Sequence, residues 1–364
     1  MKIQFLKALD RWLGAALVRL LPAPRLVSPP SEPRSFLLIR PGGIGDAVLL
    51  APAIRLLRER FPKARIDVLA ERRNAGVFDL VPGINSVFHY DNPRQLARVL
   101  CRHYDLVIDS EQWHRLSAVV ACLVGAPVKI GFASNERSRL FTHSIGYDLD
   151  RYEVLSFLDL LAPIGIQPSE VAPSKGVVVP EKARHIAAEL LKMVAHRPLL
   201  VLFAGASIPE KRWDKKNFRI LIDAGLARGF AVAMVGGPGD VAVNESAAAG
   251  RDVLNLAGQT RFAETAAVLE QAACVVSGDS GVLHLAAALD RPIVALFGPS
   301  NPCKWGPRGA RQIILQTTPA CSPCSKFGYT PPCNQNIRCL AELTPSSVIA
   351  AIDDLLYLKI DRET

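Results

Sequence analysis

The feature that most constrains the fold is an alternation of short apolar runs with longer amphipathic segments. It begins at residue 36 and begins again at residue 199. Apolar runs without polar alternation are typical of strands buried on both faces of a parallel sheet. The pattern predicts an α/β chain with two parallel-sheet halves. The expected strands are 36–40, 64–70, 86–90 and 105–109, then 199–205, 231–237, 253–258, 274–279 and 292–298.

Length and charge narrow the functional classes. A chain of 364 residues that is 49% hydrophobic is too long for a disulfide-stapled mini-protein and too apolar for a disordered one. Its 43 Lys+Arg against 34 Asp+Glu give a formal charge of +9, which predicts an anionic partner. Aromatic residues make up only 7% of the chain, so nucleic acid is the least favoured anion.

Residues 1–33 stand apart from the alternating pattern. Residues 1–25 place apolar side chains on one helical stripe and basic side chains opposite, and the Pro-rich stretch 22–33 follows as a tether. The stretch is too charged to span a bilayer and lacks the uninterrupted apolar core of a signal peptide. Two interpretations stay open: an interfacial helix on an anionic membrane surface, or a helix docked on the protein.

The first expected strand runs into the glycine-rich turn RPGGIGD at 40–46. Gly42, Gly43 and Gly45 let the backbone approach a ligand, and the helix that follows offers free N–H groups. The spacing is neither GxGxxG nor Walker A. Asp46 either caps this helix or, because it follows a strand's carboxyl end, faces a ligand crevice where it acts as a general base.

Two further glycine-rich turns lie in the second half. In GASIPEKRW, at 205–213, Ser207, Lys211 and the backbone around Gly205 can hold a phosphate. In SGDSGVLH, at 277–284, the helix start at Ser280 and Gly281 can bind a diphosphate. The other candidate ligand-binding residues are Asp279 for sugar hydroxyls, Asp240 for a ribose, and His284 for an electrostatic role near the phosphate.

Four cysteines cluster near the C-terminus: Cys321, Cys324, Cys333 and Cys339. The spacing C-x₂-C-x₈-C-x₅-C predicts a structural metal site, with zinc first and iron second. Reduced thiols or one disulfide are the alternative. Cys101, Cys122 and Cys274 lie in apolar patterns and are expected in the core.

The three turns, read together, resemble a known family. RPGGIGDAVLLAPAIRLLRERFP, GASIPEKRW and SGDSGVLHLAAAL…PIVALFGPSNP are similar to the motifs of the family 9 glycosyltransferases, the ADP-heptose:lipopolysaccharide heptosyltransferases and their relatives. The resemblance covers the chain from about residue 36 to 356. It implies a GT-B fold, in which two Rossmann-like parallel-sheet domains face a central cleft.

The resemblance also implies that different domains bind the acceptor and the donor. It gives an acceptor-binding domain at 34–172 and a nucleotide-sugar-binding domain at 173–345 that includes the cysteine cluster at 321–339. The amphipathic basic helix and tether at 1–33 precede these domains, and apolar spacing predicts a C-terminal helix at 346–364 after them. Transfer is expected to be inverting and to need no metal or other cofactor. Asp46 resembles the family's base, and Lys211 the cation that offsets charge on the departing diphosphate.

The expected partners follow from this resemblance. They are a nucleotide-sugar donor, typically ADP-heptose, a glycolipid acceptor in lipopolysaccharide core biosynthesis or a related glycan, and an anionic inner-membrane surface. The expected location is the cytoplasm, peripheral on the inner membrane. The alternatives are a protein heptosyltransferase of the autotransporter type and a Rossmann-type NAD(P)-dependent oxidoreductase. Asp148-Leu-Asp150 matches a metal-binding DxD pattern by chance, in a polar loop.

Overall fold

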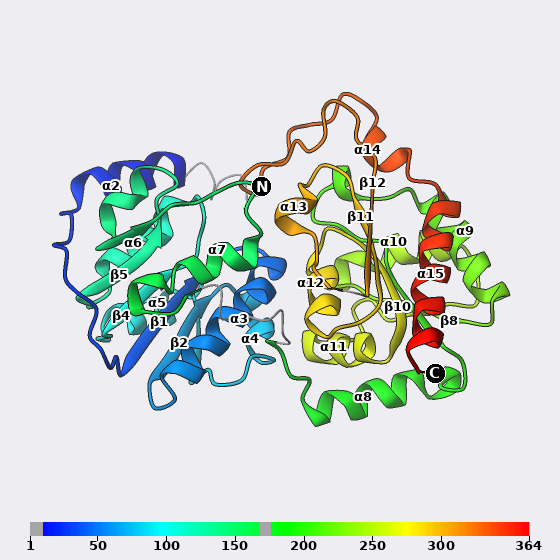
Figure 1. Cartoon of the computed structure of the whole chain (residues 1–364), viewed down its shortest axis with the longest axis horizontal. Coiled ribbons are helices and arrows are strands. Elements are labelled where there is room, and N and C mark those ends of the chain that lie inside the picture. Colours follow the sequence, from blue (N-terminus) through cyan, green and yellow to red (C-terminus); the bar gives the residue numbers. More distant parts are fainter. Residues whose placement is uncertain (1–9, 168–175, 310, 364) are drawn as a thin grey trace. The chain divides into compact units, whose positions relative to one another are not determined.

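The computed structural model describes residues 10–167, 176–309 and 311–363 (Figure 1). The chain divides after Gly176 into a first unit, residues 1–176, and a second unit, residues 177–364. We describe each unit by itself. The predicted domain boundary between residues 172 and 173 lies outside the described residues.

The first unit is built on a six-stranded parallel sheet with the order β3-β2-β1-β4-β5-β6. Its strands are β1 (Ser35–Arg40), β2 (Arg65–Ala70), β3 (Ser86–His89), β4 (Leu106–Asp109), β5 (Val128–Phe132) and β6 (His143–Ile145). Its helices include α2 (Ala15–Leu20), α3 (Ile44–Arg60), α4 (Arg72–Phe78), α5 (Pro93–Leu100), α6 (Arg115–Leu123) and α7 (Glu153–Asp159).

The second unit repeats this architecture with a six-stranded parallel sheet in the order β12-β11-β10-β7-β8-β9. Its strands are β7 (Leu199–Phe203), β8 (Ala231–Met234), β9 (Leu254–Asn255), β10 (Ala272–Gly278), β11 (Ile293–Phe297) and β12 (Gln312–Gln316). Its helices include α8 (Glu181–Leu191), α9 (Lys215–Ala227), α10 (Val241–Ala248), α11 (Phe262–Glu270), α12 (Gly281–Ala288), α13 (Pro302–Trp305), α14 (Arg338–Ala341) and α15 (Pro345–Glu363).

Both sheets have the strand order 3-2-1-4-5-6 of the Rossmann fold, counted within each unit. The order reverses between β1 and β4 in the first sheet and between β7 and β10 in the second. At these two points Ile39 pairs with Asp109, and Phe203 pairs with Ser277. Loops that leave the carboxyl ends of such strand pairs diverge to opposite faces, which opens a crevice for ligands.

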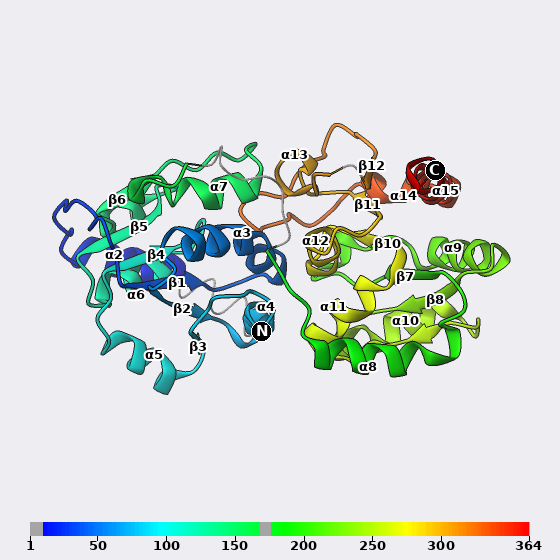
Figure 2. The same ribbon diagram turned by 60° about the horizontal axis from the view of Figure 1, so that its bottom comes forward.

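Helices cover both faces of each sheet, as Figure 2 shows. In the first unit, Leu37 and Ile39 of β1 pack in one core cluster with Val99 of α5 and Ala118 of α6. The alternate residue Phe36 points to the other face, where its ring lies 5.4 Å from that of Phe61 at the end of α3. Both faces of β1 are therefore apolar, which is why its sequence shows no polar alternation.

The predicted strands are confirmed in place, but three edge or near-edge strands, β5, β6 and β12, were missed. β5 reads VKIGF, and Lys129 breaks its apolar run. Lys129 is nonetheless buried, because its ammonium group donates to the carbonyls of Cys122 and Val124 at the end of α6. A cation at a helix C-terminus satisfies free carbonyls there, so the strand tolerates the charge.

The described part of the N-terminal segment is docked on the first unit. It forms a π-type turn, η1 (Asp10–Gly14), followed by α2, whose Val18 is fully buried in the core cluster. Asp10 Oδ1 accepts hydrogen bonds of 2.8 Å from the backbone N–H groups of Arg115 and Leu116, and so caps α6 from outside the helix. Residues 1–9 of the predicted amphipathic helix lie outside the described residues.

Within the described ranges, no helix combines the length and the apolar composition needed to cross a membrane.

Candidate functional site

Asp46 lies in the first turn of α3, directly after β1. Its side chain is half-buried, and its Oδ1 accepts a hydrogen bond of 3.0 Å from Nε2 of Gln112. Gln112 follows β4, the strand next to β1. The carboxylate is therefore held at the point where the first sheet reverses its strand order, as expected for a group that faces a ligand crevice.

Gly43 belongs to this arrangement because it leaves room for the carboxylate. A Cβ atom at Gly43 would lie 2.5 Å from Oδ2 of Asp46, well inside van der Waals contact. Gly42 has a φ of +102°, a conformation that side chains other than glycine rarely adopt. For Gly45 the structure shows a place in the first turn of α3 beside Asp46. Gly43 thus places no side chain against the Asp46 carboxylate.

Beneath this turn lies a buried charged network that sequence reasoning missed. Arg40 is only 1% exposed, and its Nη2 donates to Glu111 Oε2 at 2.7 Å. Burial opposes the charge of Arg40, but the carboxylates around it, Glu111 and Asp46 first, raise its pKa overall. The same ion pair outweighs burial at Glu111 and lowers the pKa of that carboxyl. Behind them Arg137 pairs with Asp109, and burial raises the pKa of Asp109.

A signal for this network was present in the sequence. The polar run Asp109-Ser-Glu-Gln112 directly follows an apolar strand, and Arg40 ends another. Because β1 and β4 are neighbours, the run and the arginine meet at one sheet edge. The order of strands in the sheet, which no single segment reveals, decides this encounter.

In the second unit, the structure brings Lys211, Asp279 and His284 together. Lys211 lies after β7, and its Nζ is 2.6 Å from Oδ2 of Asp279, which follows β10. His284 Nε2 lies 3.5 Å from Asp279 Oδ1, and Ser300 donates a hydrogen bond to Oδ2. Burial works against the charge of Asp279, but Lys211 and His284 hold its pKa far below the usual range. The carboxylate is therefore ionised at neutral pH and orients the lysine.

His284 is 3% exposed, and its Nδ1 has no hydrogen-bond partner in the part of the chain that the structure describes. Ser280 is the N-cap of α12, and its Oγ accepts from Leu283 N at 3.2 Å. Gly281 is the first residue of that helix, so its N–H is among those that an α-helix leaves without an internal partner. These residues surround the end of β10 and offer positive potential there.

The structure places the other predicted donor-binding residues on neighbouring loops. Gly205 and Asp240 are adjacent, since a Cβ at Gly205 would lie 2.3 Å from Asp240 Oδ1. Asp240 Oδ2 accepts from Gly237 N at 2.9 Å, so one carboxylate oxygen is used by its own loop. Ser207 is exposed on the loop after β7. Trp213, at the end of this motif, is a core residue whose Nε1 donates to Leu343 O.

The four clustered cysteines are neighbours in space. Burial raises the pKa of Cys339 to about 11, and the charges of Cys324, Cys321 and Cys333 contribute to this rise. Cys333 Sγ accepts backbone hydrogen bonds from Gln335 and Ile337. Among the described residues, however, no group of three or more His, Cys, Asp or Glu side chains is arranged to hold a metal ion.

The cysteines expected in the core divide into three cases. Cys274 is buried in β10, and Cys122 is half-buried in α6. Cys101 is exposed, so its core prediction is wrong. It ends α5, where the helical pattern no longer turns its side chain inward.

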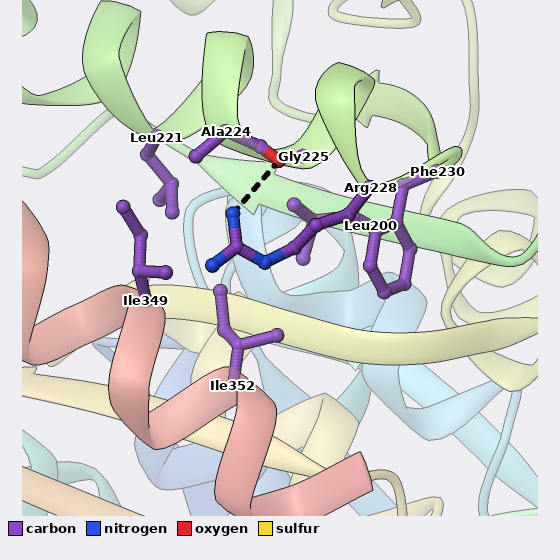
Figure 3. A pocket seen from close by; sticks show the side chains of 8 residues that line it. All are labelled: Leu200, Leu221, Ala224, Gly225, Arg228, Phe230, Ile349 and Ile352. Atoms are coloured by element: carbon purple, nitrogen blue, oxygen red, sulfur yellow. Dashed lines mark hydrogen bonds between the residues drawn. The ribbon is translucent and has the colours of Figure 1, made fainter.

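A small apolar pocket lies apart from these residues, between α9 and α15 (Figure 3). The residues that line it are Leu200, Leu221, Ala224, Gly225, Arg228, Phe230, Ile349 and Ile352. Arg228 is the polar group among them, and its guanidinium donates to Ala224 O and to the carboxylate of Asp353. None of the predicted site residues lines this pocket. It is a small gap where α9 and α15 pack against β7.

Comparison with known proteins adds an independent line of evidence. Residues 93–333 match the family model described as glycosyltransferase family 9 (heptosyltransferase). The chain is 29% identical to lipopolysaccharide heptosyltransferase 3 of Escherichia coli, over 86% of this chain and 96% of that protein. It is 26% identical to lipooligosaccharide heptosyltransferase 2 of Haemophilus ducreyi, over 88% of this chain and 99% of that one.

The fold has a counterpart among solved structures. The structure of E. coli ADP-heptose lps heptosyltransferase II superposes with a TM-score of 0.74 at 23% identity, and the match covers 89% of this chain and 99% of that one. The predicted fold class, two parallel-sheet α/β domains of the GT-B type, is thereby confirmed.

Proposed function

Since the chain belongs to glycosyltransferase family 9 and is a glycosyltransferase, we propose that it transfers heptose, or a related sugar, from an ADP-sugar to a lipopolysaccharide core or related glycan. The transfer inverts the anomeric centre and uses no catalytic metal. Membership of a glycosyltransferase family argues against the alternative of a Rossmann-type oxidoreductase. The names of the curated relatives support heptose and lipopolysaccharide as substrates.

One observation carries the mechanism: each sheet presents, at its own reversal point, a group suited to one half of the reaction. The half-buried Asp46 offers a carboxylate in the first unit, and Lys211, oriented by Asp279, offers a cation in the second. Asp46 takes the proton of the acceptor hydroxyl, and the oxygen of that hydroxyl forms the new bond to the anomeric carbon. The bond from that carbon to the diphosphate breaks, and Lys211 offsets the charge left on the diphosphate.

Lys211 can do this without releasing Asp279. An ammonium group has three N–H donors, and the pair with Asp279 uses one of them. The N-terminus of α12, at Gly281, adds backbone N–H groups at the same sheet edge. The negative charge that grows on the departing diphosphate is thus offset by fixed groups of the protein, without a divalent ion.

Two measurements test the donor assignment: the melting temperature of the protein with different nucleotide sugars, and the transfer of sugar to an acceptor. We expect ADP-heptose to raise the melting temperature of the protein more than UDP- or GDP-sugars, because ligands stabilise the state that they bind. Turnover with a heptose-accepting core glycolipid should persist in excess EDTA and give the inverted anomer by NMR. Stabilisation by UDP-sugars alone, or a strict need for Mg²⁺ or Mn²⁺, would contradict the proposal. Transfer to a polypeptide instead of the glycolipid would favour the autotransporter-type alternative.

We further propose that the docked N-terminal segment holds the enzyme on an anionic membrane surface. Trp12, Leu13 and Leu20 are 75%, 44% and 80% exposed, while Val18 of the same segment is fully buried. Arg11 and Arg19 are also exposed, and Arg11 lies 6.0 Å from the Trp12 ring centroid. Exposed Trp and Leu side chains with arginines between them suit the interface of an acidic bilayer.

Vesicle binding tests this surface. We expect the protein to co-sediment with vesicles containing phosphatidylglycerol, more weakly with pure phosphatidylcholine, and less as salt rises. The double variant Trp12→Ser/Leu20→Ser should lose most of this binding. Met193→Ser is the matched control, because Met193 is 81% exposed in the second unit. Unchanged binding of the double variant would exclude this face as the contact.

For the cysteine cluster we propose a structural zinc or iron ion held by Cys321, Cys324, Cys333 and Cys339. Binding would have to draw the thiols together, because no three of these described side chains are arranged to hold a metal in the structure. Burial raises the pKa of the Cys324 and Cys339 thiols, and the negative charges of neighbouring cysteines in the cluster raise it further. A bound cation would reverse that repulsion and favour the thiolates. Protein purified without chelator should carry about one ion per chain by elemental analysis, since four thiolates complete a tetrahedral site. Cys333→Ser should lose the ion and exposed Cys303→Ser should keep it; equal metal content would refute the site.

A further inference from the structure

The hydrogen bond that Asp46 accepts comes from a residue that is itself tightly held. Gln112 is only 8% exposed, and its Nε2 donates both to Asp46 Oδ1 at 3.0 Å and to Glu153 Oε1 at 2.7 Å. A primary amide has two N–H groups, so each carboxylate receives one of them. One amide therefore links the proposed base to a second, fully buried carboxylate.

The orientation of the Gln112 amide is fixed from the opposite side by Arg40. Both Nη1 and Nη2 of Arg40 donate to Gln112 Oε1 at 3.3 Å. Arginine has donors and no acceptor, so only the amide oxygen can face it, and the NH₂ group must face the carboxylates. Arg40 is in turn anchored by Ser110 O at 2.8 Å and by Glu111. The amide cannot flip without placing donor against donor.

Glu153 closes the network at its far end. Its side chain is buried at the start of α7, and its Oε2 accepts a hydrogen bond of 2.9 Å from Tyr147. The two carboxylate oxygens of Glu153 thus have separate donors, Gln112 and Tyr147. Gln112 is held by this carboxylate and by Arg40 together, which leaves its remaining N–H aimed at Asp46.

We propose that Gln112 is a positioning residue that fixes the Asp46 carboxylate by Oδ1 and directs Oδ2 toward the acceptor hydroxyl. This inference rests on the proposed role of Asp46 as base. Gln112 is the hydrogen-bond donor to Asp46 among the described residues, and Oδ2 lies beside Gly43, which has no side chain to cover it. A base that is free to rotate would spend part of its time away from the reacting proton, so a fixed carboxylate raises kcat.

The decisive variant is Gln112→Met, which keeps the length of the side chain and removes both donors. We expect kcat to fall about 100-fold, since misplacement of a reacting group by about 1 Å costs this much. KM for the sugar nucleotide should change little, because its proposed binding residues belong to the second unit. Gln112→Glu is the second variant. Its carboxylate can still accept from Arg40, but when ionised it offers Asp46 no donor and adds a negative charge beside Asp46 and Glu153, so the melting temperature of this variant is compared with that of the wild type.

A double-mutant cycle separates positioning from a general structural role. If Gln112 acts through Asp46, Gln112→Met should cost little further activity in an Asp46→Asn background. Gln95→Met is the control, because Gln95 is a half-buried glutamine of the same unit. Its side chain accepts a hydrogen bond from the backbone N–H of His89 and has no proposed role in the reaction. It should keep the wild-type kcat.

Each remaining outcome has a defined meaning. Wild-type kcat in either folded Gln112 variant would overturn the positioning role, and so would an equal loss of activity in the presence and absence of Asp46. Full activity of Asp46→Asn alone would instead overturn the proposed base, whatever Gln112 does. The two failures are therefore distinguishable.

Discussion

Asp46→Asn should lower kcat by about 10²–10⁴-fold, the usual contribution of a general base. The substitution preserves the shape of the side chain and an oxygen that can accept from Gln112 Nε2, so the local fold should survive. What it removes is the group that takes the proton of the acceptor hydroxyl. The measurement is steady-state transfer with saturating donor and acceptor.

Donor binding supplies the internal check on this result. The affinity for ADP, measured by calorimetry, should be nearly unchanged, because the proposed donor residues belong to the second unit. Asp79→Asn is the matched control, since Asp79 is an exposed aspartate of the same unit at the end of α4. Retention of kcat within about 3-fold in Asp46→Asn would remove this residue from the mechanism, since that is far below a base's contribution.

Lys211→Met should lower kcat/KM by about 10²–10³-fold, the range seen when one preorganised electrostatic group is removed from a transition state. Methionine keeps the length of the side chain but not the charge that offsets the departing diphosphate. The effect should fall on kcat more than on KM, because the negative charge grows as the bond to the anomeric carbon breaks.

Stability must be followed in parallel for this variant, since Asp279 loses its nearest cation. His284 and Ser300 continue to face its carboxylate, so we expect a lower melting temperature with retained folding. Lys216→Met is the control, because Lys216 is an exposed lysine of the same unit on α9. If Lys216→Met loses as much activity as Lys211→Met, the effect is one of overall charge and not of the site.

The apolar runs predicted the inner strands well, because a strand buried on both faces has to be apolar throughout. Two edge strands, β6 and β12, escaped for the opposite reason. β6 and β12 have neighbours on one side only, and their residues are half-buried or exposed. β5 contains a buried lysine, whose ammonium group donates to carbonyls five and seven residues earlier, at the end of α6. The charge breaks the apolar run by which a buried strand is recognised.

The candidate site divides in the same way. The glycine-rich turns and their acidic and basic residues could be found from sequence, since chemistry at strand ends is a local pattern. The pairing of these residues with their hydrogen-bond partners could not be found in this way. Gln112 lies 66 residues from Asp46 and Asp279 lies 68 residues from Lys211, and nothing local couples either pair.

By itself, the sequence determined the α/β class, the two halves, the family and the residues that carry chemistry, because apolar periodicity and strand-end motifs are written in consecutive residues. The tertiary structure decided which of those residues meet. The order of strands sets β1 beside β4 and β7 beside β10, and this adjacency links Asp46 to Gln112 and Lys211 to Asp279. It also decided that the described N-terminal segment docks on the first unit through Asp10 and Val18 while Trp12 stays exposed. The physical reason is that strand pairing and helix docking depend on the burial of surfaces far apart in the chain, and a single segment carries only its own half of each contact.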